Sequence, residues 1–241
     1  MKLKSSAGLL LALCFAGLAT APPVLADGKA AELNAHAKKY QQLFQQASNE
    51  FNVPVELLEA IAYAETRWQP HVAKGKAKKT GEPEVEVESH AGMPISYGVM
   101  GLRNDPYFGF TLNQGAALIR ETPATVESDT RANIRAAAAV LAQYGARKTK
   151  AFPLEDWAEA VARYSGIPQP AIAEMYSYEV FSAIRQGREG HGYKIRQRHV
   201  EMEKIYGKEK LKKLSGKRIM IETGVPDPKI SAPDFIDPPN K

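Results

Sequence analysis

An acidic side chain lies where the hydrophobic pattern of a predicted helix calls for an apolar one. The helix that begins at Pro54 carries an apolar stripe, and Glu65 is its next member at helical spacing. The apolar members are Leu58, Ile61 and Ala62. Burial disfavours an ionised carboxylate, so this position predicts a raised pKa for Glu65, as a general acid for glycoside cleavage requires. The same spacing also fits an acid at the edge of the stripe that pairs with a basic neighbour.

Several aromatic and polar side chains could assist such an acid, and each also has a purely structural interpretation. Trp68 follows Glu65 by about one helical turn and offers a flat face for a sugar ring. Tyr97 and Met100 could line a groove or simply pack under a turn. Asn133 lies early in an alanine-rich helix, where it could contact a ligand or make a structural hydrogen bond.

The elements that must position these side chains are mostly helices. Apolar periodicity, capping residues and glycine or proline boundaries predict helices over residues 27–50, 54–68, 112–119, 129–144, 154–164, 171–186 and 193–214. Asp129 or Thr130 can cap the fourth of these, and Gly145 can end it. We therefore expect an all-α, mainly helical fold with one domain over residues 27–187.

Two segments between these helices have a different character. Residues 71–89 carry four lysines and four glutamates in separate blocks, which predicts a long solvated loop with a short exposed hairpin around residues 84–88. Residues 91–110 are rich in glycine and aromatic residues and predict a series of turns. Outside the acidic loop we find no convincing β-alternation and no internal repeat.

Both ends of the chain differ from the predicted domain. Residues 1–26 have two lysines, an apolar run too short to span a membrane, and small residues before a cleavage site after Ala26, which indicates a signal peptide. We therefore expect export to the periplasm or the extracellular space, with no integral membrane segment after cleavage. Residues 188–241 hold 13 Lys/Arg and 8 Asp/Glu and predict a basic helical tail with a proline-rich, disordered end.

Composition excludes several classes of protein. The single cysteine, Cys14, excludes a disulfide scaffold, an iron–sulfur site and a CxxC zinc site. His191 and His199 do not share a helix face, so no metal and no cofactor is expected. The formal charge of +5 suits an anionic partner, but export argues against nucleic acid.

Four segments in order resemble the lytic transglycosylases of the soluble-lytic-transglycosylase type, which share the goose-lysozyme fold. Residues 53–68 (VPVELLEAIAYAETRW) resemble the catalytic helix, and residues 95–105 (ISYGVMGLRND) resemble the glycine–methionine turn. Residues 129–144 (DTRANIRAAAAVLAQY) are similar to the Asn-Ile helix, and residues 160–166 (AVARYSG) to the tyrosine motif. The resemblance covers residues 53–187.

The resemblance implies a lysozyme-like domain that acts on peptidoglycan strands. Glu65 matches the family's single catalytic glutamate, which protonates the glycosidic oxygen between MurNAc and GlcNAc. The 6-hydroxyl of the same MurNAc then attacks its own C1 with the glutamate as base, giving a 1,6-anhydro product. Tyr164 matches the tyrosine that supports this acid, and its apolar stripe also fits a core tyrosine with a satisfied hydroxyl.

The sequence departs from the family pattern at three positions near these motifs. Thr66 replaces the usual serine and keeps a hydroxyl, and Ser165 replaces a frequent asparagine. Gly101 stands where a glutamine usually follows the methionine, so one substrate-contacting amide is missing. We expect Thr66, Trp68, Tyr97, Met100 and Asn133 to contact substrate.

Two other functions fit the same sequence. A hydrolytic muramidase needs a second carboxylate to activate water, and the nearby options in sequence are Glu86, Glu88, Asp105 and Asp129. A catalytically inactive module could instead bind peptidoglycan or take part in assembly. In that case the basic tail could recruit a protein of the cell envelope.

Overall fold

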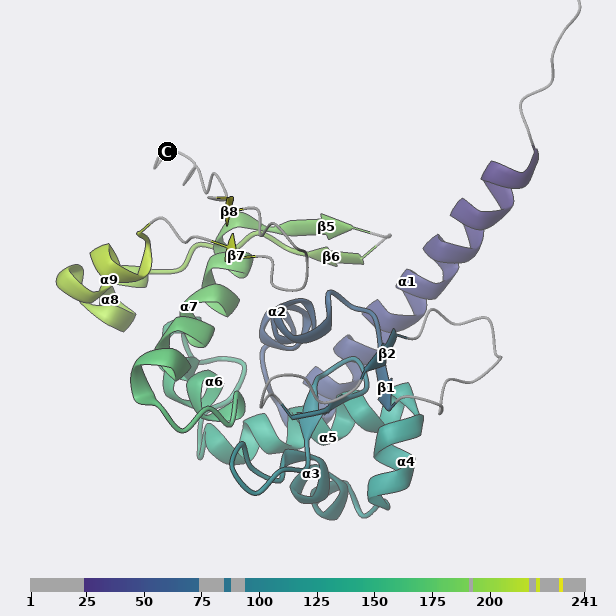
Figure 1. The fold of residues 1–241 in the computed structure, drawn as a ribbon, viewed down its shortest axis with the longest axis horizontal. Helices are drawn as coiled ribbons and strands as arrows, with labels where there is room; N and C mark the ends of the chain where they lie inside the picture. The colour runs from purple at the N-terminus through teal and green to yellow at the C-terminus, as the bar shows by residue number, and fades with distance from the viewer. Residues whose placement is uncertain are drawn as a thin grey trace, which may run out of the picture.

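The computed structural model describes residues 24–73, 85–87, 94–190, 193–216, 220–221 and 230–231. Helices make up 62% of these residues, which confirms the expected mainly α fold (Figure 1). In chain order the elements are α1 (Val24–Phe51), α2 (Val55–Thr66), β1 (His71–Ala73), β2 (Val85–Val87), β3 (Ser96–Tyr97), β4 (Leu102–Arg103), α3 (Thr111–Ile119), α4 (Pro123–Ser128), α5 (Thr130–Tyr144), the 3-10 helix η1 (Leu154–Trp157), α6 (Ala158–Tyr164), α7 (Pro170–Gln186), β5 (Arg188–Gly190), β6 (Tyr193–Ile195), α8 (Met202–Tyr206), α9 (Lys208–Leu214), β7 (Met220–Ile221) and β8 (Ile230–Ser231).

Helix α5 is the central element of the core. It packs against α1, α3, α4 and α6, and most of its side chains are buried. Its first turn is capped by Asp129, whose side chain accepts a hydrogen bond of 2.7 Å from the Ala132 amide. Helix α3 packs closely against α5 because Gly115 has no side chain. A Cβ at this position would lie only 2.8 Å from the Cβ of Ala136. Helix α2 contacts α1, α5 and α7, and so carries its last turn into the interior.

The short strands join loops to this helical core. β3 and β4 form an antiparallel pair around the turn at residues 98–101, and His71 forms a bridge to Gly98. β1 and β2 pair in parallel, so the predicted local hairpin at residues 84–88 is wrong. Residues 74–84 and 88–89 of the predicted loop lie outside the described residues. The sequence also did not predict α4 or the pairs β3–β4 and β5–β6.

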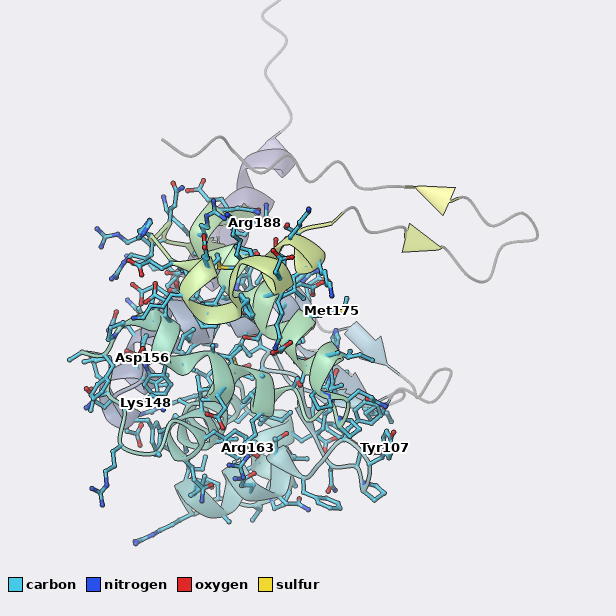
Figure 2. All side chains as sticks on the ribbon, turned by 90° about the vertical axis from the view of Figure 1, so that its left-hand side faces the viewer. Tyr107, Lys148, Asp156, Arg163, Met175 and Arg188 are labelled. Atoms are coloured by element: carbon cyan, nitrogen blue, oxygen red, sulfur yellow. The ribbon has the colours of Figure 1, made fainter. Side chains whose placement is uncertain are left out.

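The basic segment after α7 packs on the helical core. A single helix was predicted over residues 193–214, but the structure has β6, a non-helical stretch, and the short helices α8 and α9. Five side chains of this segment are buried in the core: Tyr193, Ile195, Val200, Met202 and Tyr206. Ion pairs of Lys204 with Asp156 (3.8 Å) and of Lys210 with Glu174 (2.6 Å) add surface contacts. Asp156 is labelled in Figure 2.

The amino-terminal end begins with an extended helix. The first half of α1 projects away from the other elements, while its second half joins the core through Tyr40 and Phe44 (Figure 1). Residues 1–23, which hold most of the predicted signal peptide, lie outside the described residues. Within the described part of the chain, no helix combines the length and the apolar character needed to span a membrane.

Candidate active site

The Glu65 side chain is buried in the last turn of α2. Its exposed fraction is 4%, so the apolar stripe of this helix does carry it into the interior. One carboxylate oxygen, Oε2, accepts hydrogen bonds from Arg103 Nη1 at 3.2 Å and Nη2 at 3.1 Å. The other oxygen, Oε1, has no hydrogen-bond partner among the described residues. The acid is therefore buried, and it also pairs with a basic residue.

Arg103 belongs to β4 and is fixed on several sides. Its Nη1 also donates to the Gly101 carbonyl at 3.1 Å, and its backbone amide donates to Thr111 Oγ1 at 2.9 Å. Burial works against the charge of Arg103, but the Glu65 carboxylate outweighs it and raises the pKa of Arg103. Removing one partner of a buried pair leaves an uncompensated charge, so the two residues depend on each other.

The turn that brings Arg103 to Glu65 requires a glycine at position 101. Gly101 has φ +61°, and a Cβ there would lie 2.5 Å from Glu65 Oε2 and 2.7 Å from Glu65 Cβ. A glutamine, the residue that the family resemblance suggests, would therefore collide with the acid in this arrangement. The departure noted in the sequence thus has a steric explanation.

Two tyrosines approach the carboxylate from α6 and α7. The Tyr164 hydroxyl donates to the Met100 carbonyl at 2.8 Å, and the Tyr176 hydroxyl interacts with the Glu65 side chain. For both hydroxyls, burial first and the Glu65 charge second raise the pKa well above its usual value. Both tyrosines therefore stay neutral and can act as hydrogen-bond donors beside the acid.

Asn133 holds the turn at residues 98–101 in place through hydrogen bonds. Its Oδ1 accepts from the Met100 amide at 2.9 Å, and its Nδ2 donates to the carbonyls of Tyr97 (3.2 Å) and Val126 (3.1 Å). A Cβ at Gly98 would lie 2.2 Å from Nδ2, so the turn rests directly on this amide. With 0% exposure, Asn133 positions the turn in this structure.

The remaining predicted contact residues lie mostly inside the core. Thr66 Oγ1 lies 3.0 Å from the Ala62 carbonyl and 2.8 Å from the Val99 carbonyl, and its single proton serves one of them. Met100 is fully buried, and Tyr97 is half-buried. Trp68 is 2% exposed and stacks on Tyr193 with ring centroids 5.3 Å apart, so a sugar could reach it only if Tyr193 moved.

Two of the four possible second carboxylates are used in local structure. Asp105 Oδ1 accepts from the backbone amides of Tyr107 (2.8 Å) and Phe108 (2.9 Å), and Asp129 caps α5. The side chain of Glu86 and the whole of Glu88 lie outside the described part of the chain. Within that part, no group of three or more His, Cys, Asp or Glu side chains could hold a metal ion.

Arg103 and Tyr176 are the residues of this site that the sequence did not single out. Tyr176 lies three residues after Ala173 and four before Val180, both buried, so the spacing of α7 could have placed it on the inner face. Arg103 gave no comparable signal because it follows a turn whose path cannot be derived from residue spacing. No known family matches the chain, and neither a curated protein nor a solved structure does.

Chemically, the site is a buried carboxylate that a guanidinium holds through one oxygen and that two neutral tyrosine hydroxyls approach. Among the described residues, the buried Arg103 Nε has no hydrogen-bond partner. An unsatisfied buried polar group costs about 1–3 kcal/mol, so a ligand or a rearrangement that bonds this atom would add stability.

Proposed function

We propose that this protein is a lytic transglycosylase that cleaves the glycan strands of peptidoglycan, with Glu65 as both acid and base. The observation that carries the proposal is that four sequence segments meet at Glu65 and at the turn beside it. The turn contacts Glu65 through Gly101, Tyr164 binds the Met100 carbonyl, and Asn133 binds the Met100 amide. These are the four segments that resemble the soluble-lytic-transglycosylase type.

In the proposed reaction, Glu65 donates its proton to the glycosidic oxygen between MurNAc and GlcNAc. The bond from MurNAc C1 to that oxygen breaks, and the 6-hydroxyl of the same MurNAc forms a new bond to C1. The Glu65 carboxylate takes the proton of this hydroxyl, which restores the acid and leaves a 1,6-anhydro product. Tyr164 would hold the turn in place through its hydrogen bond to Met100.

A single carboxylate is sufficient for this reaction, and this favours it over hydrolysis. A hydrolytic muramidase would need a second carboxylate to activate water. The two described candidates, Asp105 and Asp129, already accept backbone hydrogen bonds in a turn and a helix cap. The lyase therefore fits the described residues better than the muramidase.

The Arg103–Glu65 contact favours a second candidate function. A general acid must carry a proton and must reach its substrate, whereas this carboxylate is ion-paired and 4% exposed. If the pair never opens, the chain would be a non-catalytic module that binds peptidoglycan or takes part in assembly. The basic segment at residues 188–241 would then serve to recruit an envelope protein. Either function requires export, for which the predicted signal peptide is the proposed route.

Product analysis on purified sacculi distinguishes these candidates. Purified mature protein should release muropeptides that carry 1,6-anhydro-MurNAc. These are lighter than the hydrolysed products by about 18 Da, because no water is added. Release of fully hydrated, reducing products would instead indicate a muramidase. Binding to sacculi without any release would support the non-catalytic module.

A further inference from the structure

Exposed aromatic side chains gather on one short turn between β4 and α3. Among the described residues, the exposed aromatic side chains are Tyr107 at 61%, Phe110 at 51% and Phe152 at 46%. Tyr107 and Phe110 are separated by only two residues, and Tyr107 lies at the edge of the molecule in Figure 2. We call residues 105–110 the aromatic turn. A single exposed aromatic residue needs no explanation, but two on one turn are typical of a binding surface.

Hydrogen bonds hold the aromatic turn in one shape. Asp105 and Gly109 exchange two backbone hydrogen bonds, at 3.0 and 2.8 Å. The Asp105 carboxylate also accepts the backbone amides of Tyr107 and Phe108. The Tyr107 hydroxyl accepts a hydrogen bond of 3.1 Å from Gln169 Nε2, and its ring packs edge-on against that of Phe108. Because the Tyr107 ring is already fixed, it loses little conformational entropy when a ligand covers it.

The aromatic turn is attached to the elements beside Glu65. It begins two residues after Arg103, which holds the Glu65 carboxylate. On the other side, Gly166 approaches the turn so closely that a Cβ there would lie 1.8 Å from the Phe108 carbonyl oxygen. A chain extends by at most about 3.6 Å per residue, so the Cα atoms of Tyr107 and Arg103 are at most about 14 Å apart. A polymer bound at the turn can therefore also reach the acid.

The surface around the aromatic turn carries almost no charge. Residues 104–119 contain one charged side chain, Asp105, and residues 164–173 contain none, although 24% of the whole chain is charged. The Asp105 carboxylate is occupied by the backbone amides of the turn. The exposed polar side chains of these two segments are carboxamides: Asn104, Asn113 and Gln169. Such a surface suits an uncharged ligand better than a nucleic acid or another polyanion, which a charged surface would attract.

An uncharged sugar matches both the aromatic rings and the carboxamides. The C–H groups on the apolar face of a sugar ring pack against the electron-rich face of an aromatic ring. Carboxamides both donate and accept hydrogen bonds, as sugar hydroxyls and N-acetyl groups require. A protein partner is less well matched, because two aromatic rings bury about 300–500 Å² together. A stable protein interface needs about 800 Å² from each partner.

We propose that the aromatic turn binds the uncharged sugar rings of a glycan strand, with Tyr107 and Phe110 as the stacking side chains. The class of ligand follows from the chemistry of the turn, and its identification with peptidoglycan glycan rests on the proposed function. Tyr107 binds the strand away from the bond that Glu65 cleaves. It therefore contributes to affinity and leaves the chemical step to Glu65.

The first test measures the affinity of the full-length mature protein for the uncharged hexamer of N-acetylglucosamine, by NMR titration. Tyr107→Ala should weaken binding by about fivefold or more, because the stacked ring is lost. Tyr107→Phe keeps the ring and should change the affinity by less than about twofold. Phe152→Ala removes an exposed aromatic ring outside the turn and should leave the affinity unchanged. Equal affinities of Tyr107→Ala and wild type, or no binding by wild type, would overturn the proposal.

The kinetics of muropeptide release from sacculi separate this proposal from the proposed function. A residue that binds the strand equally in the ground state and the transition state raises KM and leaves kcat unchanged. Tyr107→Ala should therefore raise KM by about fivefold or more, with kcat within about twofold of wild type. Release with an unchanged KM would overturn the proposal and keep the lyase. Hexamer binding that depends on Tyr107, without any release from sacculi, would support the proposal and contradict the lyase.

Two further measurements exclude other causes of a lost affinity. Urea denaturation of Tyr107→Ala should match wild type, as expected for an exposed side chain. If this variant is unstable, Phe110→Ala replaces it, because it leaves the hydrogen bond from Gln169 to Tyr107 intact, and the same loss of affinity is expected. Sedimentation of the same proteins tests a second copy of the chain as the occupant. A wild-type dimer that Tyr107→Ala dissociates would assign the turn to that copy and overturn the proposal.

Discussion

At the scale of single residues, the contact between Gly101 and Glu65 sets the geometry of the site. A side chain at position 101 would lie 2.5 Å from Glu65 Oε2, and the backbone there has φ +61°. Gly109 also has a positive φ, +92°, but a Cβ at that position would meet nothing within 4 Å. The two glycines therefore separate the effect of backbone strain from the effect of crowding against the acid.

Gly101→Gln should destabilise the protein more than Gly109→Gln. Strain in the left-handed region should lower the free energy of unfolding by about 1–2 kcal/mol at both positions. Crowding against Glu65 should lower it by about 1–3 kcal/mol more at position 101. Urea denaturation of both variants measures this difference. Equal losses in the free energy of unfolding would show that a side chain at position 101 does not crowd Glu65.

A second acid of α2 links stability to pH. Glu59 is 6% exposed, and burial together with the nearby Glu56 charge raises its pKa from 4.5 to about 8. Glu56 itself pairs with Arg198 at 2.5 Å, whereas no side-chain partner of Glu59 is found in the described structure. The folded protein therefore keeps a proton on Glu59 over a pH range in which the unfolded chain has lost it.

The sign of this linkage predicts a loss of stability as pH rises. The raised pKa of Glu59 contributes to the free energy of unfolding. This contribution is fully present below pH 4.5 and is lost as the pH rises toward 8. Relative to Glu59→Gln, the wild-type free energy of unfolding should fall by on the order of 3 kcal/mol across this range. Urea denaturation at several pH values measures it, with the exposed Glu159→Gln as control. Parallel curves for wild type and Glu59→Gln would contradict the prediction.

At the scale of elements, the sequence was most informative where periodicity and caps agreed. The predicted helix at residues 129–144 corresponds to α5, which is capped by Asp129 and followed by Gly145. Periodicity also placed Glu65 and Tyr164 on inner faces, where the structure has them. These features depend on spacing within one element, which a sequence shows directly.

Features that depend on contacts between elements could not be derived in this way. Arg103 reaches Glu65 only because the turn at residues 98–101 rests on Asn133, 33 residues beyond Met100. In the basic segment, the dense charges suggested a solvated helix. Its alternation of buried Tyr193, exposed Lys194 and buried Ile195 is instead the period of a strand. The high charge of this segment therefore led to the prediction of a helix, although a three-residue strand pattern was present.

The docking of this segment predicts a specific loss of stability. Tyr193 packs on Trp68 and, edge to face at 5.5 Å, on Tyr40. Truncation of a buried aromatic side chain leaves a cavity, so Tyr193→Ala should lower the free energy of unfolding by about 3 kcal/mol or more.

Thermal and urea denaturation measure this effect. Tyr107→Ala is the control, because Tyr107 is 61% exposed and should change stability by less than about 0.5 kcal/mol. Equal stabilities of Tyr193→Ala and wild type would show that the segment after α7 does not contribute to the core.

At the scale of the whole molecule, a mainly helical core surrounds the buried acid Glu65. Residues 53–68, 95–105, 129–144 and 160–166 are separate along the chain, and their contacts meet at Glu65 and the Met100 turn. A core could be built without placing an acid at this meeting point. The proposed reaction therefore requires that Glu65, which is paired with Arg103, becomes accessible to substrate.

The most direct test of the central claim is the rate of muropeptide release from purified sacculi by wild type, Glu65→Gln and the exposed control Glu159→Gln. Mass spectrometry records the products over time. The account predicts 1,6-anhydro products from wild type and from Glu159→Gln at the same rate. From Glu65→Gln it predicts release reduced by about 100-fold or more, as expected for loss of a general acid. Equal release by Glu65→Gln and wild type would contradict the claim that this carboxyl performs the reaction.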